Sequence, residues 1–377
     1  MTEQIFMLYF DNAATGGFKP DNVISAVVSA LKCCANPGRS GHKLSVACLE
    51  RVYACRKLLS EFFGGYGYER VVFTKNCTEA LNIAILGTIN SGDEVVTTVA
   101  EHNSVLRPLE FLKGRGVTVK YAPLNNKNEI DVPALTGMVT EKTKAVIITL
   151  ASNVTGTAPD IAEVSRSIPE SCLLICDGAQ ACGHIKIDMQ KNGIDALAVA
   201  GHKGMLGIQG SGALIFSERF NPNPVTFGGT GSESHNLAMP DFYPDRLESG
   251  TLSYPAIISL AEGALYLSEN LEKDAEKTFK MTAYICEKLS GMNGIRLYSR
   301  PNPFGVIAIG FKNLQSELAA HTLSEMGICV RGGLHCAPLM HEALKSDGLV
   351  RVSLSAFNTQ NECEQLVSAI NKISVTP

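Results

Sequence analysis

Short runs of apolar, largely β-branched residues recur through the first two-thirds of the chain, and segments with helical spacing lie between most of them. Such runs predict buried strands. Seven strands are expected, at 70–74, 94–98, 117–122, 144–150, 173–177, 195–200 and 212–216. The intervening helical segments, for example 77–87 and 103–113, require crossover connections. The pattern therefore predicts a mostly parallel sheet with helices on both faces and with ligands at the carboxyl ends of its strands.

The pattern changes after about residue 255. A long helical stretch is expected first, followed by shorter strands separated by helices, at 256–289, 304–311, 316–326, 328–331, 350–354 and 361–373. A chain of 377 residues is also too long for one ordinary core. We therefore expect a large domain over residues 16–255 and a smaller α/β domain formed by residues 1–15 and 256–377.

Composition narrows the functional classes. Apolar residues make up 45% of the chain, charged residues 19%, and the net charge is −4 with no basic run, so nucleic acid is not an expected partner. The N-terminus lacks the pattern of a signal peptide, and no window approaches the ~20 apolar residues of a membrane span. We expect a cytoplasmic protein without a membrane partner.

The 12 cysteines include no CxxC pair, so no metal site is predicted. Most of them are expected to be buried free thiols in a reducing compartment. The adjacent Cys33 and Cys34 receive no role from the sequence.

The segment AGHKG at 200–204 directly follows an expected strand. A lysine at a strand end, beside His202 and small glycines, can be desolvated enough to attack an aldehyde, which makes Lys203 a candidate nucleophile. The alternative is a solvated lysine in a surface turn.

Two further strand ends carry polar residues. Asp177 ends the apolar run 173–177, where a carboxylate needs a positive partner such as a protonated pyridine nitrogen. A helix cap for residues 178–181 is the alternative. The segment NCTEALNIA opens a helix at Cys77 and Thr78, whose backbone amides suit a phosphate. The alternative there is a plain helix N-terminus.

Ten motifs occur in a fixed order between about residues 9 and 360: YFDNAAT, RSGH, FTKNCTEALN, EHNSV, SNVTG, CDGAQ, GHK, ESGTLS, RGGLHCAP and RVSLSAFNT. This series resembles the class V pyridoxal-phosphate enzymes, and within them the cysteine desulfurase and selenocysteine lyase group. Each motif is weak alone, but ten in order are highly specific. The resemblance implies the fold type I architecture of pyridoxal-phosphate-dependent transferases, with a large, mostly parallel seven-stranded domain and a smaller α/β domain.

The resemblance also implies roles around the cofactor, pyridoxal 5′-phosphate. Lys203 would hold it as a Schiff base and later move protons, His102 would stack on its pyridine ring, and Asp177 would pair with the ring nitrogen. Thr251 would reach the phosphate of the partner subunit, which implies a homodimer. Further contacts, to the phosphate and the phenolic oxygen, would come from Cys77, Thr78, His202, Asn153 and Gln180.

On the substrate side, Arg351 would clamp the α-carboxylate bidentately, as a lysine could not do equally well. The residues expected beside that carboxylate are Asn12, Ala13 and Asn153. Cys336 stands at the position of the sulfur-accepting cysteine of the family, in a loop-like segment where Arg331 and His335 could favour its thiolate. A buried structural cysteine is the alternative.

Three positions depart from the pattern of the family. Ala200 replaces a Ser or Thr that can touch the phosphate, Ile208 replaces a frequent proline, and Leu334 precedes His335 where one branch has a second histidine. They bear on phosphate affinity and on the choice of substrate.

The expected function is a pyridoxal-phosphate-dependent cysteine desulfurase that takes sulfur from L-cysteine as a persulfide on Cys336, releases L-alanine and serves a possible protein sulfur acceptor. The alternatives are a selenocysteine lyase, a cysteine sulfinate desulfinase or another C–S lyase, and, in a different class, a non-catalytic sulfur-trafficking protein.

Overall fold

The computed structural model describes residues 7–33 and 35–374, so Cys34 lies outside the described residues. Its central sheet has seven strands in the order β2-β8-β7-β6-β5-β3-β4. They are β2 (Val71–Thr74), β3 (Glu94–Thr98), β4 (Thr118–Ala122), β5 (Thr143–Thr149), β6 (Leu173–Asp177), β7 (Ala196–Ala200) and β8 (Gly212–Phe216). Strand β8 runs antiparallel to both neighbours and the other pairings are parallel. The predicted mostly parallel sheet is confirmed.

Both faces of the sheet are buried, which explains why its strands are continuous apolar runs. Successive residues point to opposite faces, so that Ile147 and Ile148 of β5 belong to different core clusters. The helices α3 (Cys77–Leu86) and α4 (Asn103–Lys113) cover one face. The other core cluster includes residues from α2 (Lys43–Phe62), α5 (Val132–Gly137), α6 (Ile161–Ser167) and the first half of α7 (Tyr254–Ser290), with α1 (Asp21–Lys32) packed on α7.

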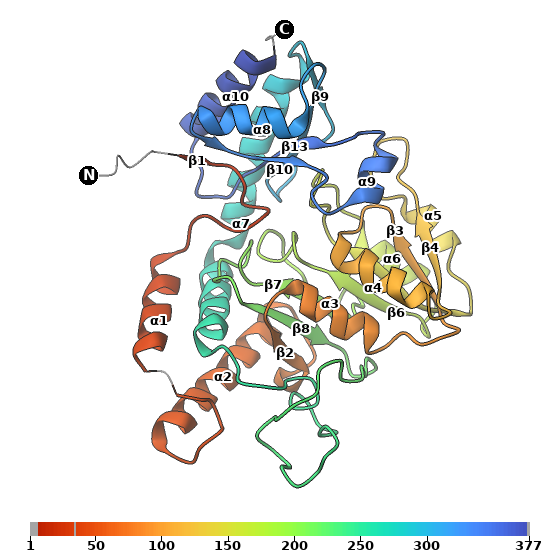
Figure 1. Cartoon of the computed structure of the whole chain (residues 1–377), viewed down its shortest axis with the longest axis vertical. Coiled ribbons are helices and arrows are strands. Elements are labelled where there is room, and N and C mark those ends of the chain that lie inside the picture. The colour runs from red at the N-terminus through yellow and green to blue at the C-terminus, as the bar shows by residue number, and fades with distance from the viewer. Residues whose placement is uncertain (1–6, 34, 375–377) are drawn as a thin grey trace.

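A second, antiparallel sheet of four strands forms the smaller layer of the molecule, in the order β12-β13-β10-β9. Its strands are β9 (Ile295–Leu297), β10 (Val306–Phe311), β12 (Arg331–Gly333) and β13 (Leu349–Ser353). The helices α8 (Ser316–Glu325) and α10 (Gln360–Ser374) and the end of α7 pack with it. Figure 1 shows α7 running from the large sheet up into this smaller layer.

The N-terminal strand β1 (Leu8–Tyr9) pairs in parallel with β11 (Ile328–Cys329), so the start of the chain packs with the second sheet. One expectation is wrong here. The segment 328–331 is two strands and not one, because the chain passes from the pairing with β1 to the edge of the four-stranded sheet within three residues. Two short elements, Tyr68–Arg70 (a 3₁₀ turn) and α9 (Pro338–Ala343), complete the described fold. Among the described helices, none has the length and apolarity needed to cross a membrane.

Candidate active site

Five parallel strands of the large sheet end at the same edge, and the segments that follow them enclose a pocket of about 480 Å³. Such an edge collects polar side chains from distant parts of the sequence. Most of the expected cofactor contacts line this pocket: Cys77, Thr78, His102, Asn153, Asp177, Gln180, His202 and Lys203. The structure therefore brings together what the motifs suggested separately.

Lys203 lies in the loop after β7 and is half-buried. Burial lowers the pKa of its amine, although the carboxylate of Asp177 opposes this shift. The alternative of a solvated turn lysine is therefore wrong. Close packing holds the loop, since a Cβ on Gly204 would stand 2.5 Å from the carbonyl oxygen of Cys182. Ile208, where a proline is frequent, donates its N–H to Ser259 Oγ over 3.0 Å, a contact that proline could not make.

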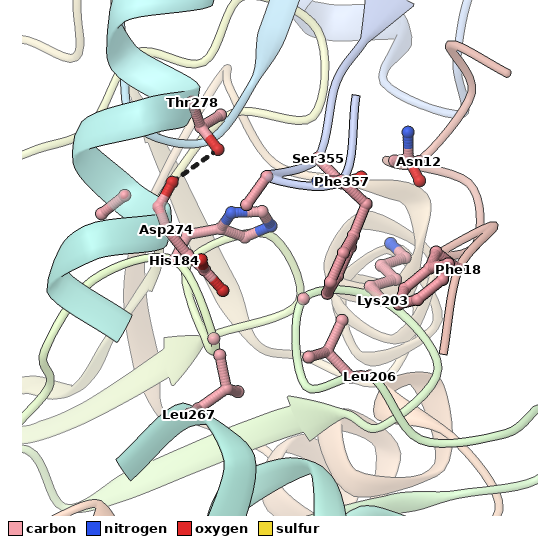
Figure 2. Close-up of a pocket in the computed structure, with 15 residues that line it drawn as sticks. Asn12, Phe18, His184, Lys203, Leu206, Leu267, Asp274, Thr278, Ser355 and Phe357 are labelled. Carbon is pink, nitrogen blue, oxygen red and sulfur yellow. Dashed lines mark hydrogen bonds between the residues drawn. The ribbon is translucent and has the colours of Figure 1, made fainter. Parts of the chain in front are cut away.

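A second pocket, of about 460 Å³, lies where the large sheet meets the second one, and Lys203 lines it as well. Figure 2 shows Lys203 together with Asn12, Phe18, His184 and Phe357 around this space. Burial lowers the pKa of His184 to about 4, which leaves its imidazole neutral. The lysine side chain thus lines two pockets.

Asp177 ends β6 and is 3% exposed. Its Oδ1 accepts hydrogen bonds from the N–H of Ala179 (2.9 Å) and from the thiol of Cys77 (3.4 Å). Residues 178–181 form turns rather than a helix, so the helix-cap alternative is wrong. Both hydrogen bonds to the carboxylate from described residues reach Oδ1, and Oδ2 is left for another donor.

His102 caps the N-terminus of α4 and lines the pocket from the end of β3. Its Nδ1 accepts a hydrogen bond from the N–H of Ser104 over 3.0 Å. Burial lowers the pKa of the ring, against the charge of Asp177, so the imidazole is neutral with its proton on Nε2. Ser104, which the motif analysis did not single out, also pairs its hydroxyl with that of Thr78 at 2.8 Å.

The N-terminus of α3 carries the expected phosphate contacts. Asn76 caps the helix by accepting the N–H of Glu79 over 2.9 Å, while the N–H groups of Cys77 and Thr78 have no intrahelical acceptor. Thr78 is exposed. Nearby, burial lowers the pKa of His202 to about 4. Ala200 is buried against the pocket and brings no hydroxyl to it.

Arg351 lies on β13 and is 2% exposed. Its Nη2 donates to Asp11 Oδ1 over 2.8 Å and its Nη1 to the carbonyl of Asn153 over 3.1 Å. Its Nε is buried without a partner among the described residues. Asp11 was not predicted, although an acid directly before Asn12 and Ala13 in DNAAT was a usable signal for the counter-ion of a buried arginine.

The N-terminal segment is tied to both sheets. Asn12 donates its side-chain amide to the carbonyl of Ser353 over 3.0 Å, and the N–H of Ala13 donates to Ser353 Oγ over 2.9 Å. Gln180 donates to the carbonyl of Ala13 over 3.0 Å. Asn12 and Ala13 therefore lie two residues along β13 from Arg351, as their expected shared role requires.

Cys336 is exposed, in the short loop between β12 and α9. Its carbonyl accepts the N–H of Asn103 over 2.7 Å, and the carbonyl of His335 accepts the side-chain amide of Asn153 over 2.7 Å. His335 and Cys336 have φ values of +51° and +57°, a left-handed backbone that costs non-glycine residues of order 1 kcal/mol or more. These contacts hold the backbone of the loop against Asn103 and against Asn153, which lines the pocket. Because Cys336 is exposed, the alternative of a buried structural cysteine is wrong.

The prediction that His335 favours the thiolate by its charge is wrong. The side chain is 4% exposed and burial lowers its pKa to about 3, so it is neutral. Its ring nitrogens face the carbonyl of Arg331 (3.2 Å) and Nε2 of His341 (3.4 Å), which gives it a structural role under the loop. A cation that does interact with Cys336 is Arg351, whose pKa is lowered by burial and raised by Asp11 and, more weakly, by the cysteine thiolate.

Glu101, next to His102, was also missed, and the acid in EHNSV was its only signal. It is fully buried. Its Oε1 accepts the hydroxyl of Thr98 (2.6 Å) and the N–H of Thr149 (3.0 Å), whereas Oε2 has no partner among the described residues. Burial raises its pKa to about 8, so a neutral carboxylic acid supports the turn that carries His102.

One expectation has no contact among the described residues that tests it. Thr251 is exposed in the segment before α7, where it lines a pocket with Lys75 and Glu79. Its contact with a partner subunit stays a prediction. Cys33, to which the sequence gave no role, is exposed at the end of α1.

The profile of the family described as Aminotransferase class-V matches residues 8–366. The chain belongs to the aminotransferase class-V family. It is similar to the probable cysteine desulfurase of Methanothermobacter thermautotrophicus, at 32% identity over 97% of this chain and 94% of that protein. It is also similar to that of Pyrococcus abyssi, at 30% identity over 99% and 95% of the two chains.

Solved structures of cysteine desulfurases agree with this assignment. The apo cysteine desulfurase of Thermococcus onnurineus NA1 superposes with a TM-score of 0.89 at 28% identity, covering 98% of this chain and 94% of that one. The cysteine desulfurase CsdA of Escherichia coli gives 0.86 at 26% identity, covering 98% and 95%. The family and the fold that the motifs implied are both confirmed.

Proposed function

We propose that this class-V member is a pyridoxal-phosphate-dependent cysteine desulfurase, which transfers the sulfur of L-cysteine to Cys336 and releases L-alanine. The observation that carries the proposal is the position of Cys336. Its exposed thiol stands on a loop held to Asn103 and Asn153, beside the pocket that contains Lys203. The similar proteins named probable cysteine desulfurases support the same reading.

The residues present fit pyridoxal phosphate. The free N–H groups at the start of α3 suit its phosphate. Oδ2 of Asp177 is available for a protonated ring nitrogen, and the lowered pKa of Lys203 leaves an amine able to react with an aldehyde. Ala200 supplies one hydroxyl fewer than many relatives would, and the hydroxyl pair of Thr78 and Ser104 lies at the same end of the pocket.

The substrate would bind through its α-carboxylate at Arg351. The unpartnered Nε of that guanidinium is a buried donor which a carboxylate oxygen would satisfy. Asp11 would keep the guanidinium of Arg351 in place by accepting the hydrogen bond from its Nη2. Asn12 and Ala13 would form the adjacent wall, because Ser353 and Gln180 fix their positions.

Bound pyridoxal phosphate supplies an electron sink for the substrate's Cα. Lys203 would take the proton from Cα, and its lowered pKa lets the amine act as a base near neutral pH. The thiolate of Cys336 would then attack the substrate sulfur. An S–S bond forms and the Cβ–S bond breaks with its electron pair on carbon. One proton would then add to Cβ and the proton held by Lys203 would return to Cα, which completes alanine, so the step needs no outside reductant.

The exposed position of Cys336 leaves its persulfide accessible to an acceptor thiol on a protein or a small molecule. All the cysteines that the structure describes are free thiols, as expected of a protein that works in the reducing cytoplasm.

The test is Cys336→Ser, with Cys33→Ser as the matched control because Cys33 is also exposed. The Cys336 variant should bind the cofactor normally but form alanine from cysteine about a hundredfold more slowly or worse, since the nucleophile is lost. Mass spectrometry of the wild-type enzyme after reaction should find the added sulfur on Cys336 alone. The Cys33 variant should behave as wild type.

Other products would point to other functions. Pyruvate and free sulfide in place of alanine would indicate a C–S lyase. Undiminished alanine formation from selenocysteine by Cys336→Ser, with no activity of the wild type on cysteine, would indicate a selenocysteine lyase. A protein that binds no cofactor would contradict the enzyme proposal altogether and favour a non-catalytic role.

We also propose that the active unit is a homodimer completed by Thr251. Thr78 is exposed at the phosphate end of the pocket, and Thr251 is exposed in the segment before α7, so both side chains are accessible to a second subunit. Lys203→Ala would inactivate the site of its own subunit, and Thr251→Ala would inactivate the site of the partner subunit. A heterodimer of the two variants would then keep one intact site, so a mixture should restore about a quarter of wild-type activity. A fully active monomer in sedimentation, or a mixture without recovery, would contradict this assembly.

A further inference from the structure

Cys77 is the first residue of α3, and its side chain points into the pocket beneath the strand ends. It is 7% exposed, and its thiol lies 3.4 Å from Oδ1 of Asp177. Burial, and secondarily the charge of Asp177, raises the pKa of the thiol well above its ordinary value. Cys77 is therefore an S–H group at all physiological pH values and can only donate to the carboxylate.

The carboxylate of Asp177 receives an uneven set of contacts. The thiol of Cys77, which precedes Asp177 in the chain, and the N–H of Ala179, which follows it, both donate to Oδ1. Among the described residues, none donates a hydrogen bond to Oδ2. A carboxylate held at one oxygen by two donors from different elements has its rotamer fixed. The second oxygen is then the one with lone pairs free for a group bound in the pocket that Asp177 lines.

We propose that Cys77 is a positioning residue for Asp177: its S–H holds Oδ1 so that Oδ2 is presented to the ring nitrogen of pyridoxal phosphate. This rests on the cofactor named in the proposed function. The contact would tune the one protein group that keeps the ring nitrogen protonated, and with it the strength of the electron sink. A thiol that only fills space in the core would do neither.

The chain provides a matched control in Cys182. This thiol is 1% exposed, burial raises its pKa well above the ordinary value, and Asp177 is close enough to add to that shift. Among the hydrogen bonds of the described residues, however, none joins Cys182 to Asp177. Cysteine-to-alanine changes at 77 and 182 therefore remove the same atom from the same neighbourhood, and only one of them removes a donor to the carboxylate.

The experiment measures cofactor binding to the apo protein by equilibrium dialysis, without turnover. Two ligands are compared: pyridoxal phosphate and its analogue with carbon in place of the ring nitrogen. Cys77→Ala should lower the affinity for pyridoxal phosphate about threefold to tenfold, the size expected for one hydrogen bond of ordinary strength, because a thiol is a weak donor. The same variant should leave the affinity for the analogue unchanged, because the analogue has no ring nitrogen for Asp177 to contact. Cys77→Ser keeps a donor and should restore most of the affinity for pyridoxal phosphate. Cys182→Ala should change the affinities for the two ligands by the same factor.

A second readout is the ¹⁵N resonance of the ring nitrogen in labelled cofactor, which should move toward the neutral pyridine value in Cys77→Ala and stay in place in Cys182→Ala. Equal weakening of both ligands by Cys77→Ala, or no weakening at all, would overturn the proposal and reduce Cys77 to a packing residue. Failure of the wild-type protein to bind pyridoxal phosphate would instead overturn the proposed function, and this inference with it.

Discussion

The two sides of the pocket are built in different ways. The side that would hold the cofactor, called the cofactor side below, consists of residues at or just after the ends of strands of the large sheet, such as Cys77 after β2 and Asp177 at the end of β6. The substrate side is assembled over long sequence distances. Arg351 meets Asp11 across 340 positions, and Asn153 meets the carbonyl of His335 across 182. Local sequence determines the cofactor side, whereas the substrate side is determined by the packing of the four-stranded sheet on the seven-stranded one.

The electrostatics of the two sides differ as well. On the cofactor side, burial lowers the pKa values of Lys203, His102 and His202, which favours neutral groups that can exchange protons. On the substrate side, Arg351 keeps its charge because Asp11 pairs with it. In the proposed function the pocket would thus separate proton transfer from anion binding, with the exposed Cys336 on the anion-binding side. The following predictions test this division.

The largest effect is expected for Lys203→Ala, which removes the amine from the cofactor side. Turnover should fall by about 10²–10⁴-fold or more, because both the attachment to the aldehyde and the proton transfer are lost. The visible absorption of the protein-bound cofactor should change, while the circular dichroism of the fold stays the same. Lys75→Ala, which alters an exposed lysine at the same sheet edge, is the control. Turnover and a spectrum like those of the wild type in Lys203→Ala would refute the central assignment.

Arg351 tests the substrate side alone. Arg351→Ala should weaken cysteine binding by about 2–5 kcal/mol, and Arg351→Lys should also bind poorly because an ammonium cannot form the planar fork. Cofactor affinity should change little in both variants. The control is Arg331→Lys, an exposed arginine that pairs with Arg351 across the sheet. Normal KM for cysteine in Arg351→Ala would show that the carboxylate binds elsewhere.

The buried carboxyl of Glu101, which supports the turn before His102, should make the stability of the fold depend on pH. Its pKa is about 8 in the folded chain against 4.5 for an ordinary glutamate, so its stabilising effect is complete below pH 4.5 and is lost as the pH rises through 8. Glu101→Gln, which is always neutral, should therefore gain stability over the wild type by on the order of 1 kcal/mol per pH unit across this window.

Urea unfolding of both proteins at pH 5 and at pH 8 measures the effect. Asp177 is the charged group that faces Glu101 from β6, so Asp177→Asn in the same comparison shows how much of the difference its charge provides. A stability difference between Glu101→Gln and wild type that does not change with pH would mean that Glu101 is ionised throughout, and that the turn before His102 is held by a charge.

Much of the cofactor side could be predicted, and the reason is local. Strands such as 173–177 are recognisable from their own apolar residues, and a polar residue at a strand end necessarily lies at the ligand-binding edge of a parallel sheet. The substrate side could be named only through the family resemblance. No local pattern connects Arg351 with Asp11 or places the loop of Cys336 against Asn103.

The sequence by itself determined where the strands and helices of the large sheet lie, and which polar residues end them, because side-chain periodicity depends on near neighbours. Tertiary structure alone decided the charge states and the contacts. His335 is neutral because other segments bury it, and Cys77 donates to Asp177 because β2 and β6 end at one edge. The loop that carries Cys336 has its place because Asn103 and Asn153 hold it. Desolvation and hydrogen bonding depend on the atoms that surround a group in space, and most of these come from distant parts of the chain.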